Sequence, residues 1–300
     1  MIRIGVDFGG TKIEAAALDA GGQFVSRVRA ANPGDYAAAI ETVCALVDEA
    51  EREAGVGRTP VGIGMPGSIS PKSGRVRNSN SVWLNGTAFD TDVQAALGRP
   101  VRVENDANCF ALSEATDGAG QGAPVVFGAI LGTGCGGGVV VGRRTVAGHN
   151  GIGGEWGHTP LPWPSAAERG ARRCWCGRDD CLERWISGSA FMADYAEATG
   201  RRLSGEEIAG LARAGDDAAV AALERYVDRL GRALAVICDI LDPDVIVCGG
   251  GMSNVTEIYG AIGWAIERHV FSDVFTTRVL AARHGDSSGV RGAAWLWPSP

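Results

Sequence analysis

The sequence has little lysine, no excess of positive charge and no long apolar segment. Lysine occurs only at Lys12 and Lys72, and 35 acidic residues outweigh 28 basic ones to give a net charge of −7. Such a chain is poorly suited to nucleic acid or to an anionic membrane, so we expect neither as a partner. The charge-free stretch 125–142 contains seven glycines and predicts strand, loop and strand rather than a membrane span. Asp7 lies too early for the apolar region of a signal peptide, so we expect a cytoplasmic protein.

What the sequence has in quantity is glycine, with 45 of 300 residues, about twice the usual ~7%. Most of these glycines fall in short clusters, which indicates loops where the backbone approaches another group closely. The hydrophobic share of 45% is enough for a core, and at roughly 150 residues per domain the length favours two domains.

Strands and helices alternate along the chain, which predicts an α/β fold. Asp35 caps an expected helix that runs to Glu53, and a long amphipathic helix begins at Asp216 and stops at Asp242. We also expect strands at 2–8, 13–18, 61–65, 101–103, 125–131, 139–141, 245–248 and 279–282, and helices from 107, over 254–271 and over 289–297.

Strand, glycine turn and strand occur twice, at 2–18 and at 125–141, so we infer two related α/β halves. We expect an N-terminal domain over 1–112, completed by a C-terminal helix at 287–300, and a larger domain over 113–286. The two domains should meet across a cleft.

Each half carries a glycine turn that is suited to phosphate. The first reads Asp7-x-Gly9-Gly10-Thr11-Lys12, and the second, Gly132–Gly138, includes Thr133 and Gly134. Successive backbone N–H groups in such turns face an anion, and one turn in each half is what a nucleotide triphosphate requires. Asp7 would face a metal ion that bridges the phosphates. The alternative for each turn is an ordinary glycine-rich hairpin.

Two further features favour the phosphate interpretation. Only two lysines occur in the chain, and one of them is Lys12 in the first turn. The compact ammonium group of lysine can bind a phosphate as a point charge, which would explain why the position is not an arginine. Gly249-Gly250-Gly251 follows a third expected strand and suits an adenine or ribose against bare backbone.

The run Glu104-Asn105-Asp106-Ala107-Asn108 opens an expected helix at the end of a strand. A carboxylate at Asp106 would act as a general base, accepting the proton of a hydroxyl group that attacks phosphorus. The alternative is that Asp106 or Asn105 only caps the helix.

Four residues have the spacing of a metal site. His158, Cys174, Cys176 and Cys181 form His-x15-Cys-x-Cys-x4-Cys. One imidazole and three thiolates make a closed tetrahedral zinc set, which is structural rather than catalytic. Such a zinc would fix the segment 155–184 of the larger domain. The alternative is three reduced thiols and an unrelated histidine.

Polar residues suited to a polyol lie in two places. Glu155 and Glu183 flank the metal set, where a rigid carboxylate would accept hydrogen bonds from hydroxyl groups. One loop combines amides with an aromatic ring, and its residues are Asn78, Asn80, Trp83 and Asn85. For any one residue of this loop, a surface turn with a partly buried tryptophan is an equal alternative.

These motifs together resemble the ROK family of sugar kinases and repressors, over essentially the whole chain. The resemblance implies a two-domain actin-like ATPase (ribonuclease H-like) fold, with ATP, Mg²⁺ and sugar in the interdomain cleft and a zinc knuckle. It implies that Asp106 is the catalytic base. It assigns sugar contacts to Asn105, Asp106, Glu155, His158 and Glu183, and nucleotide contacts to Gly9, Gly10, Thr11, Lys12, Thr133, Gly134, Gly249 and Gly250. His158 would share sugar binding with zinc ligation.

One position departs from the family pattern, which has glycine before the last cysteine where this chain has Asp180. Aspartate tolerates a left-handed backbone better than most residues, so we expect the knuckle to survive.

The segments 66–71, 78–86, 157–163 and 284–292 resemble the bacterial fructokinase (manno(fructo)kinase) branch of this family. We therefore expect ATP-dependent phosphorylation of fructose at its 6-hydroxyl, by a protein that the family suggests is a homodimer. N-acetylglucosamine, glucose and mannose are alternative substrates.

Two other classes remain as alternatives. The family's repressors carry an N-terminal DNA-binding module, for which a first strand at Ile2 leaves no room, so a sugar-responsive regulator is disfavoured. A non-catalytic sugar-binding protein is disfavoured by Asp106 and the two phosphate turns.

Overall fold

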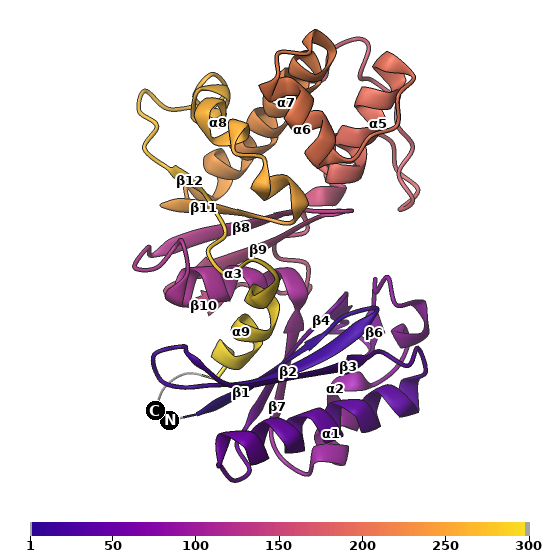
Figure 1. Cartoon of the computed structure of the whole chain (residues 1–300), viewed down its shortest axis with the longest axis vertical. Helices are drawn as coiled ribbons and strands as arrows, with labels where there is room; N and C mark the ends of the chain where they lie inside the picture. The colour runs from indigo at the N-terminus through magenta and orange to yellow at the C-terminus, as the bar shows by residue number, and fades with distance from the viewer. Residues whose placement is uncertain (1, 298–300) are drawn as a thin grey trace. The chain divides into compact units, whose positions relative to one another are not determined.

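The computed structural model describes residues 2–297, which fold into two compact units (Figure 1). Unit 1 comprises the chain up to Gly122, the segment Gly138–Gly154 and the chain from His284 on, and unit 2 comprises Ala123–Gly137 and Glu155–Arg283. This division differs from the expected boundary at residue 112. Residues 113–122 and 138–154 belong with the N-terminal part because helix α3 (Asp106–Asp117) continues to residue 117 and contacts strand β10 (Arg144–Thr145).

The sheet of unit 1 has the order β3-β2-β1-β4-β7. Its strands are β3 (Phe24–Ala31), β2 (Lys12–Leu18), β1 (Arg3–Phe8), β4 (Val61–Met65) and β7 (Val101–Asn105). Strands β1 and β2 are antiparallel, whereas β1, β4 and β7 run parallel. The carboxyl ends of β1, β4 and β7 therefore share one edge of the sheet, and this edge carries Asp7 and Asn105.

Helices cover both faces of this sheet. The view in Figure 1 shows α1 (Tyr36–Ala54) on one face and α9 (Ser288–Trp295) on the other. The predicted cap of α1 is confirmed, since the Asp35 carboxylate accepts the Ala38 N–H at 3.0 Å. Helix α9 packs so closely that a Cβ at Gly62 would lie 1.8 Å from the Ala293 carbonyl oxygen. Helix α2 (Phe89–Leu97) contacts α1 and β7, and a two-stranded ribbon joins β5 (Ser68–Ile69) to β6 (Val76–Arg77).

The second sheet has the order β10-β9-β8-β11-β12. Its remaining strands are β9 (Cys135–Val141), β8 (Val125–Leu131), β11 (Val245–Gly249) and β12 (Arg278–Ala281). Numbered within each sheet, both have the order 3-2-1-4-5, which agrees with the inference of two related α/β halves. Strand β11 is parallel to β8 and to β12, so the carboxyl ends of β8 and β11 lie together.

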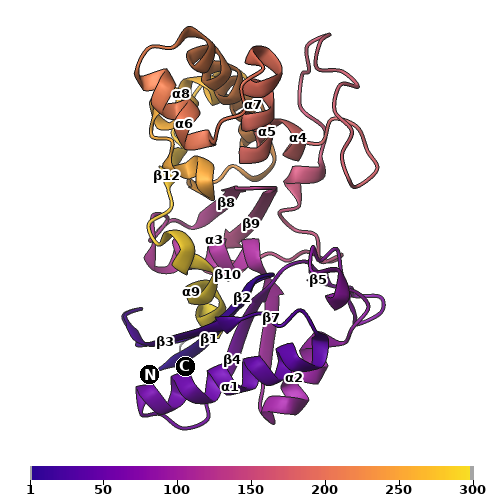
Figure 2. The ribbon, with the colours of Figure 1, turned by 45° about the vertical axis from the view of Figure 1, so that its right-hand side comes forward.

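The remaining helices of unit 2 gather on one side of β8 and β11 (Figures 1 and 2). They are α4 (Glu183–Ile186), α5 (Gly188–Thr199), α6 (Gly205–Arg213), α7 (Asp217–Leu241) and α8 (Glu257–Glu267). The expected helix from Asp216 is confirmed as α7. Asp216 caps its N-terminus, and Asp242 ends it in the left-handed region at φ 47°.

Three predictions about elements were wrong in detail. Glycines 136–138 belong to strand β9, so the second glycine turn is limited to residues 132–134. The expected helix over 254–271 is shorter, because the extended backbone of Val255 delays its start and α8 ends at Glu267. The last helix ends at Trp295 rather than Trp297, whose indole N–H instead donates to the Val61 carbonyl oxygen at 3.0 Å.

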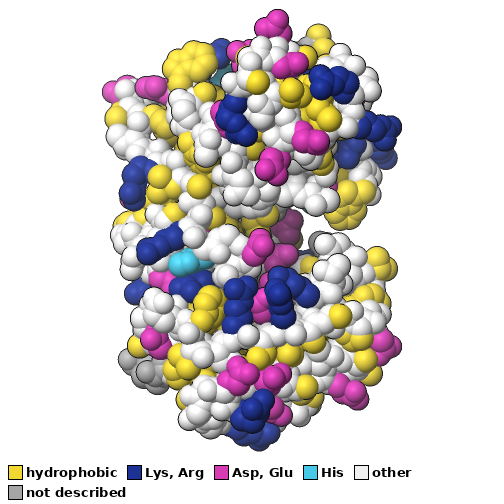
Figure 3. Space-filling view, viewed as in Figure 1, with side chains coloured by type: hydrophobic (Ala, Val, Ile, Leu, Met, Phe, Trp, Pro, Cys, Tyr) yellow, Lys and Arg dark blue, Asp and Glu magenta, His cyan; other side chains and the backbone are white. Residues whose placement is uncertain are grey.

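None of the helices within residues 2–297 is long and apolar enough to cross a membrane. On the face shown in Figure 3, basic and acidic side chains are interspersed over both units.

Candidate active site

Two carboxylates lie close together at the shared strand edge of unit 1. Asp7 lies near the end of β1, and Asp106 is the first residue of α3, directly after β7. Burial is the largest cause that raises the pKa of Asp7, the negative charges of Asp106 and Glu14 add to it, and the resulting pKa is about 6. Asp106 is exposed, and its Oδ1 accepts the N–H of Ala107 at 2.9 Å. This edge therefore concentrates negative charge around an accessible carboxylate.

The helix cap next to Asp106 is made by Asn105. Its Oδ1 accepts the N–H groups of Ala107 and Asn108, and its Nδ2 donates to the Gly67 carbonyl oxygen at 3.0 Å. The capping alternative thus holds for Asn105, while the carboxylate of Asp106 faces solvent. One amide hydrogen of Asn105 is already committed to Gly67, which leaves the other for a ligand.

Glu104, which has no predicted role in the motif, holds this corner together through its hydrogen bonds. Its Oε1 accepts hydrogen bonds from the Asn105 N–H and from Asn108 Nδ2, and its Oε2 accepts from Thr145 Oγ1 at 3.1 Å. Glu104 is part of a motif that the sequence displays, but its partner Thr145 is 41 residues away, and nothing in the sequence indicates that the two side chains meet.

The first glycine turn joins β1 to β2 as a hairpin. Gly9 N–H donates to the Lys12 carbonyl oxygen at 3.0 Å, and Asn32 fastens the turn through the carbonyl groups of Gly9 and Thr11. Gly10 and Thr11 are exposed at its tip. Lys12 Nζ lies 3.7 Å from the Glu14 carboxylate, which is buried and also paired with Arg27.

The polar loop after β6 is only partly available to a ligand. Trp83 packs on the core residue Phe8, with ring centroids 6.0 Å apart. The amide of Asn85 bonds both backbone groups of Ser79 at 2.9 Å, which closes the loop on itself. Asn80 is exposed. The alternative of a surface turn therefore describes Trp83 and Asn85, and Asn80 remains the candidate ligand of this loop.

Two residues of the second glycine turn, Gly132 and Thr133, line a large cavity within unit 2. Gly132 N–H donates to the Gly134 carbonyl oxygen at 3.1 Å, and Thr133 is exposed. The cavity has a volume of about 710 Å³. Its lining includes Gly132, Thr133, Ser189, Glu206, Gly251 and Met252.

The glycine run after β11 contributes to this cavity in a different way from that expected. Gly249 is buried in the strand, and Gly251 lines the cavity. Gly250 has φ 77°, and a Cβ there would lie 2.6 Å from the Leu131 carbonyl, so its bare backbone packs against the end of β8. Ser189 and Glu206 come from helices α5 and α6, which the sequence analysis did not expect.

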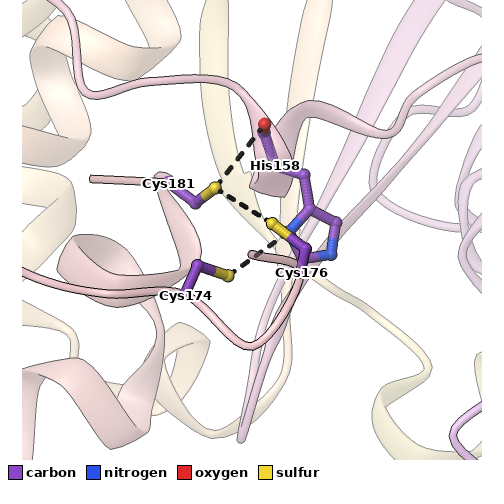
Figure 4. A group of neighbouring side chains, drawn as sticks. All are labelled: His158, Cys174, Cys176 and Cys181. Carbon is purple, nitrogen blue, oxygen red and sulfur yellow. Dashed lines mark hydrogen bonds between the residues drawn. The ribbon is translucent and has the colours of Figure 1, made fainter. Parts of the chain in front are cut away.

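The four predicted metal ligands converge within unit 2 (Figure 4). One donor atom from each of His158, Cys174, Cys176 and Cys181 lies within 4.8 Å of all the others. The Cys176 and Cys181 sulfur atoms are 3.5 Å apart, and Cys174 Sγ is 3.7 Å from His158 Nδ1. Sulfur atoms bound to one zinc at about 2.3 Å would be separated by roughly 3.8 Å in a tetrahedron, so these separations fit the ion.

The backbone of the zinc knuckle, within the segment 155–184, has the expected conformation at Asp180, the position that departs from the family pattern. Asp180 has φ 56°, in the left-handed region that the missing glycine would have occupied. Its carboxylate accepts the N–H groups of Gly170 and Arg172, so it fastens the preceding loop as well.

The two predicted carboxylates beside the knuckle differ. Glu155 is exposed. Glu183 Oε1 accepts the indole N–H of Trp175 at 2.6 Å, and its Oε2 accepts the Cys135 N–H at 3.2 Å. A Cβ at Gly134 would lie 2.7 Å from this Oε2, so Glu183 directly adjoins the second glycine turn.

A buried ion cluster holds the segment before the knuckle against α5 and α7. Arg229 bonds both Glu168 and Asp194, at 2.8 and 2.7 Å, and Arg232 bonds Glu168 at 3.1 Å. Burial alone would raise the pKa of Glu168, but the hydrogen bonds from the two arginines outweigh it and lower the pKa to about 2. The segment thus has an anchor in addition to the four candidate metal ligands.

The chain is similar to known proteins over nearly its whole length. The model of the ROK family matches residues 3–299. The chain is 41% identical over 297 residues to an N-acetyl-D-glucosamine kinase from Escherichia coli O6:H1, covering 97% of this chain and 98% of that one.

Two solved structures are similar over nearly their full lengths. The ROK hexokinase from Thermus thermophilus is 34% identical, with a TM-score of 0.87, covering 99% of this chain and 97% of that one. A ROK family glucokinase from Streptomyces griseus, in complex with glucose and AMPPNP, is 31% identical, with a TM-score of 0.79 and 99% of both chains covered.

Proposed function

The chain belongs to the ROK family, and on this premise we propose that it is an ATP-dependent sugar kinase that phosphorylates the 6-hydroxyl of a hexose. The observation that carries the proposal is the exposed carboxylate of Asp106 beside Asp7. Asp106 lies at the strand edge where open α/β sheets bind their ligands. The identity to a kinase over 97% of the chain supports the same activity.

For the substrate we propose N-acetyl-D-glucosamine first. The support is that the relative with 41% identity is an N-acetyl-D-glucosamine kinase. Fructose is the second candidate, on the segments that resemble the fructokinase branch. No comparison reported above names a fructokinase, so the preference for fructose stays a prediction.

In the proposed reaction the sugar 6-hydroxyl attacks the γ-phosphorus of ATP in line, and ADP leaves. Asp106 accepts the hydroxyl proton as the new oxygen–phosphorus bond forms. Its position at the first turn of α3 places the carboxylate near the positive end of the helix.

Asp7 is the proposed residue for Mg²⁺. The donor chemistry fits, because a carboxylate whose pKa is raised by burial and by two other acids is in a site with excess negative charge that a divalent cation would offset. When bound, Mg²⁺ would neutralise phosphate charge. The exposed Gly10 and Thr11 at the first hairpin tip would add backbone and hydroxyl donors for the same phosphates.

We propose the cavity of unit 2 for the nucleotide. About 710 Å³ lies within the range of pockets for drug-sized ligands. Thr133 and Gly134 would meet the phosphates, and Gly250 and Gly251 would form the wall against the adenosine, whereas Gly249 is buried in β11.

The sugar contacts are proposed for Asn80, Asn105, Glu155, His158 and Glu183. Glu183 has the strongest support, since its carboxylate accepts hydrogen bonds from Cys135, directly after the glycine turn, and from Trp175 in the cysteine cluster. A sugar held there would lie near the phosphates held by the turn.

A structural Zn²⁺ is proposed for the cluster of one histidine and three cysteines. The separations of the donor atoms and the closed donor set support it. The ion would fix a loop whose residues lack regular secondary structure from Thr159 to Leu182. A homodimer also remains a proposal.

The test is a coupled assay of ADP release with N-acetyl-D-glucosamine, fructose, glucose and mannose, each over a range of concentrations. We expect the highest kcat/KM for N-acetyl-D-glucosamine. A higher value for fructose would restore the sequence-based substrate, and ADP release that no sugar stimulates would refute the kinase.

A further inference from the structure

We propose that Trp175 is a positioning residue, whose indole N–H holds the Glu183 carboxylate in the orientation that binds the sugar. The inference rests on the proposed function, because it concerns the sugar contact assigned to Glu183. It gives a role to a residue that neither motif nor spacing singled out.

Both oxygens of Glu183 are held, by donors from two different elements. Trp175 Nε1 donates to Oε1 at 2.6 Å, and the backbone N–H of Cys135, directly after the glycine turn, donates to Oε2 at 3.2 Å. A glutamate side chain has several rotatable bonds, and it samples many orientations unless its head is fixed. Two donors on opposite oxygens leave the remaining lone pairs pointing in defined directions.

The indole itself is fixed by the metal-binding knuckle. Trp175 lies between two of the cysteines, and the backbone hydrogen bond from Cys174 N–H to the Arg178 carbonyl oxygen, 2.9 Å, closes the loop around it. Its ring meets the His158 ring edge-on, with centroids 4.9 Å apart and an angle of 85°. Because the loop and the His158 ring hold the indole in place, the hydrogen bond from Trp175 holds Glu183 in place as well.

The exposure of Trp175 excludes burial as the main reason for this arrangement. The residue is 73% exposed, so packing of its ring contributes little to the fold. The hydrogen bond to a carboxylate is of the stronger, charge-assisted kind. What the residue supplies in this arrangement is therefore the donor.

A different role would use the ring face, on which a sugar could stack. The two roles are separated by Trp175→Phe, which keeps a ring and removes the donor, and by Trp175→Ala, which removes both. If the indole acts through Glu183, Phe and Ala weaken sugar binding alike. If the ring stacks on the sugar, Phe retains the affinity of the wild type.

The experiment measures the dissociation constant of the best sugar of the four by calorimetry without nucleotide, together with the zinc content and KM for ATP. We expect Trp175→Phe to weaken sugar binding about five- to tenfold, with zinc content and KM for ATP unchanged. Trp163→Phe is the matched control, because Trp163 is also exposed but stacks on His269, and it should bind sugar as the wild type does.

A double-variant cycle tests whether the indole acts through Glu183. In a Glu183→Gln background, adding Trp175→Phe should change the dissociation constant by less than about twofold. Wild-type affinity in Trp175→Phe, loss of zinc in that variant, or a full additional loss in the double variant would each overturn the proposal. Failure of the wild type to phosphorylate any sugar would instead refute the proposed function.

Discussion

At the residue scale, two carboxylates have different proposed tasks. Asp106 is exposed, whereas Asp7 is partly buried and has its pKa raised to about 6. One strand edge thus holds an accessible base and a charged site for a cation. The two groups can be tested separately, because one governs turnover and the other also governs stability.

Replacing Asp106 with asparagine should remove the base while keeping the shape of the side chain. We expect Asp106→Asn to lower kcat about 10²- to 10⁴-fold, with little change in the sugar dissociation constant. Steady-state assays and calorimetry measure the two quantities. Asp35→Asn is the control, since asparagine caps α1 as well as aspartate does. A turnover in Asp106→Asn within threefold of wild type would mean that another group is the base.

Asp7 should make the metal-free protein less stable as pH rises. Its folded pKa, about 6, exceeds the ordinary 3.8, so between these values the native state binds more protons than the unfolded state. The free energy of unfolding therefore falls as pH rises from about 4 to 6, by about 3 kcal/mol at 1.36 kcal/mol per pKa unit. Asp7→Asn should remove this slope and unfold at higher urea at pH 7. Urea titrations at several pH values without Mg²⁺ measure it, and an unchanged slope would contradict the assignment.

Some residues of the candidate site could be predicted from the sequence, and others could not. The four candidate metal ligands are close in sequence, so their spacing was enough to predict the cluster. The amide of Asn105 and the indole of Trp175 act through partners that only folding brings near, Gly67 in one case and Glu183 in the other. Glu104 likewise acts through Thr145, a partner that is distant in the sequence.

At the scale of elements, the helices with a side-chain cap and a regular apolar face could be predicted. Helices α1 and α7 have both, with caps at Asp35 and Asp216. Helix α2 begins at Phe89, its N-cap residue Ala88 offers no side-chain acceptor, and the helix was missed. Helix α6 was also missed, although Ser204 and Glu207 form a capping box that the sequence displays.

The ion cluster that anchors the segment before the knuckle should matter for stability. Glu168→Gln removes the charge that pairs with two buried arginines, and we expect a loss of about 3 kcal/mol at pH 7. Since the pKa of Glu168 is lowered, this contribution is present above pH 4.5 and is lost as pH falls towards 2.

Thermal unfolding at pH 7 and at acid pH measures this effect. Asp179→Asn, which breaks the exposed pair with Arg173, is the control and should cost less than about 1 kcal/mol. Equal losses in the two variants would show that the cluster is no anchor.

The knuckle itself should hold one metal ion. Replacing Cys174, Cys176 and Cys181 together with serine should reduce bound zinc from about one per chain to nearly none and lower the melting temperature. Elemental analysis of the purified proteins measures the zinc content. Cys44→Ser, a half-buried cysteine outside the cluster, is the control. Undiminished zinc in the triple variant would remove the ion from the account.

At the scale of the whole molecule, two sheets with the same strand order support the view of duplicated α/β halves. Each half contributes a glycine turn, and each turn lies at the end of its first strand. The sequence predicted this duplication because strand, turn and strand recur locally. The expectation that ATP and sugar bind in a cleft between the two units stays a prediction.

The most direct test of the central claim is to follow the phosphoryl group by ³¹P nuclear magnetic resonance. Purified protein is incubated with ATP, Mg²⁺ and N-acetyl-D-glucosamine, and in parallel with the 6-deoxy analogue of that sugar. The account predicts a new phosphomonoester at the 6-position, with an equal amount of ADP, and no such product from the analogue. ATP that remains intact, or that yields only inorganic phosphate whichever sugar is present, would contradict it.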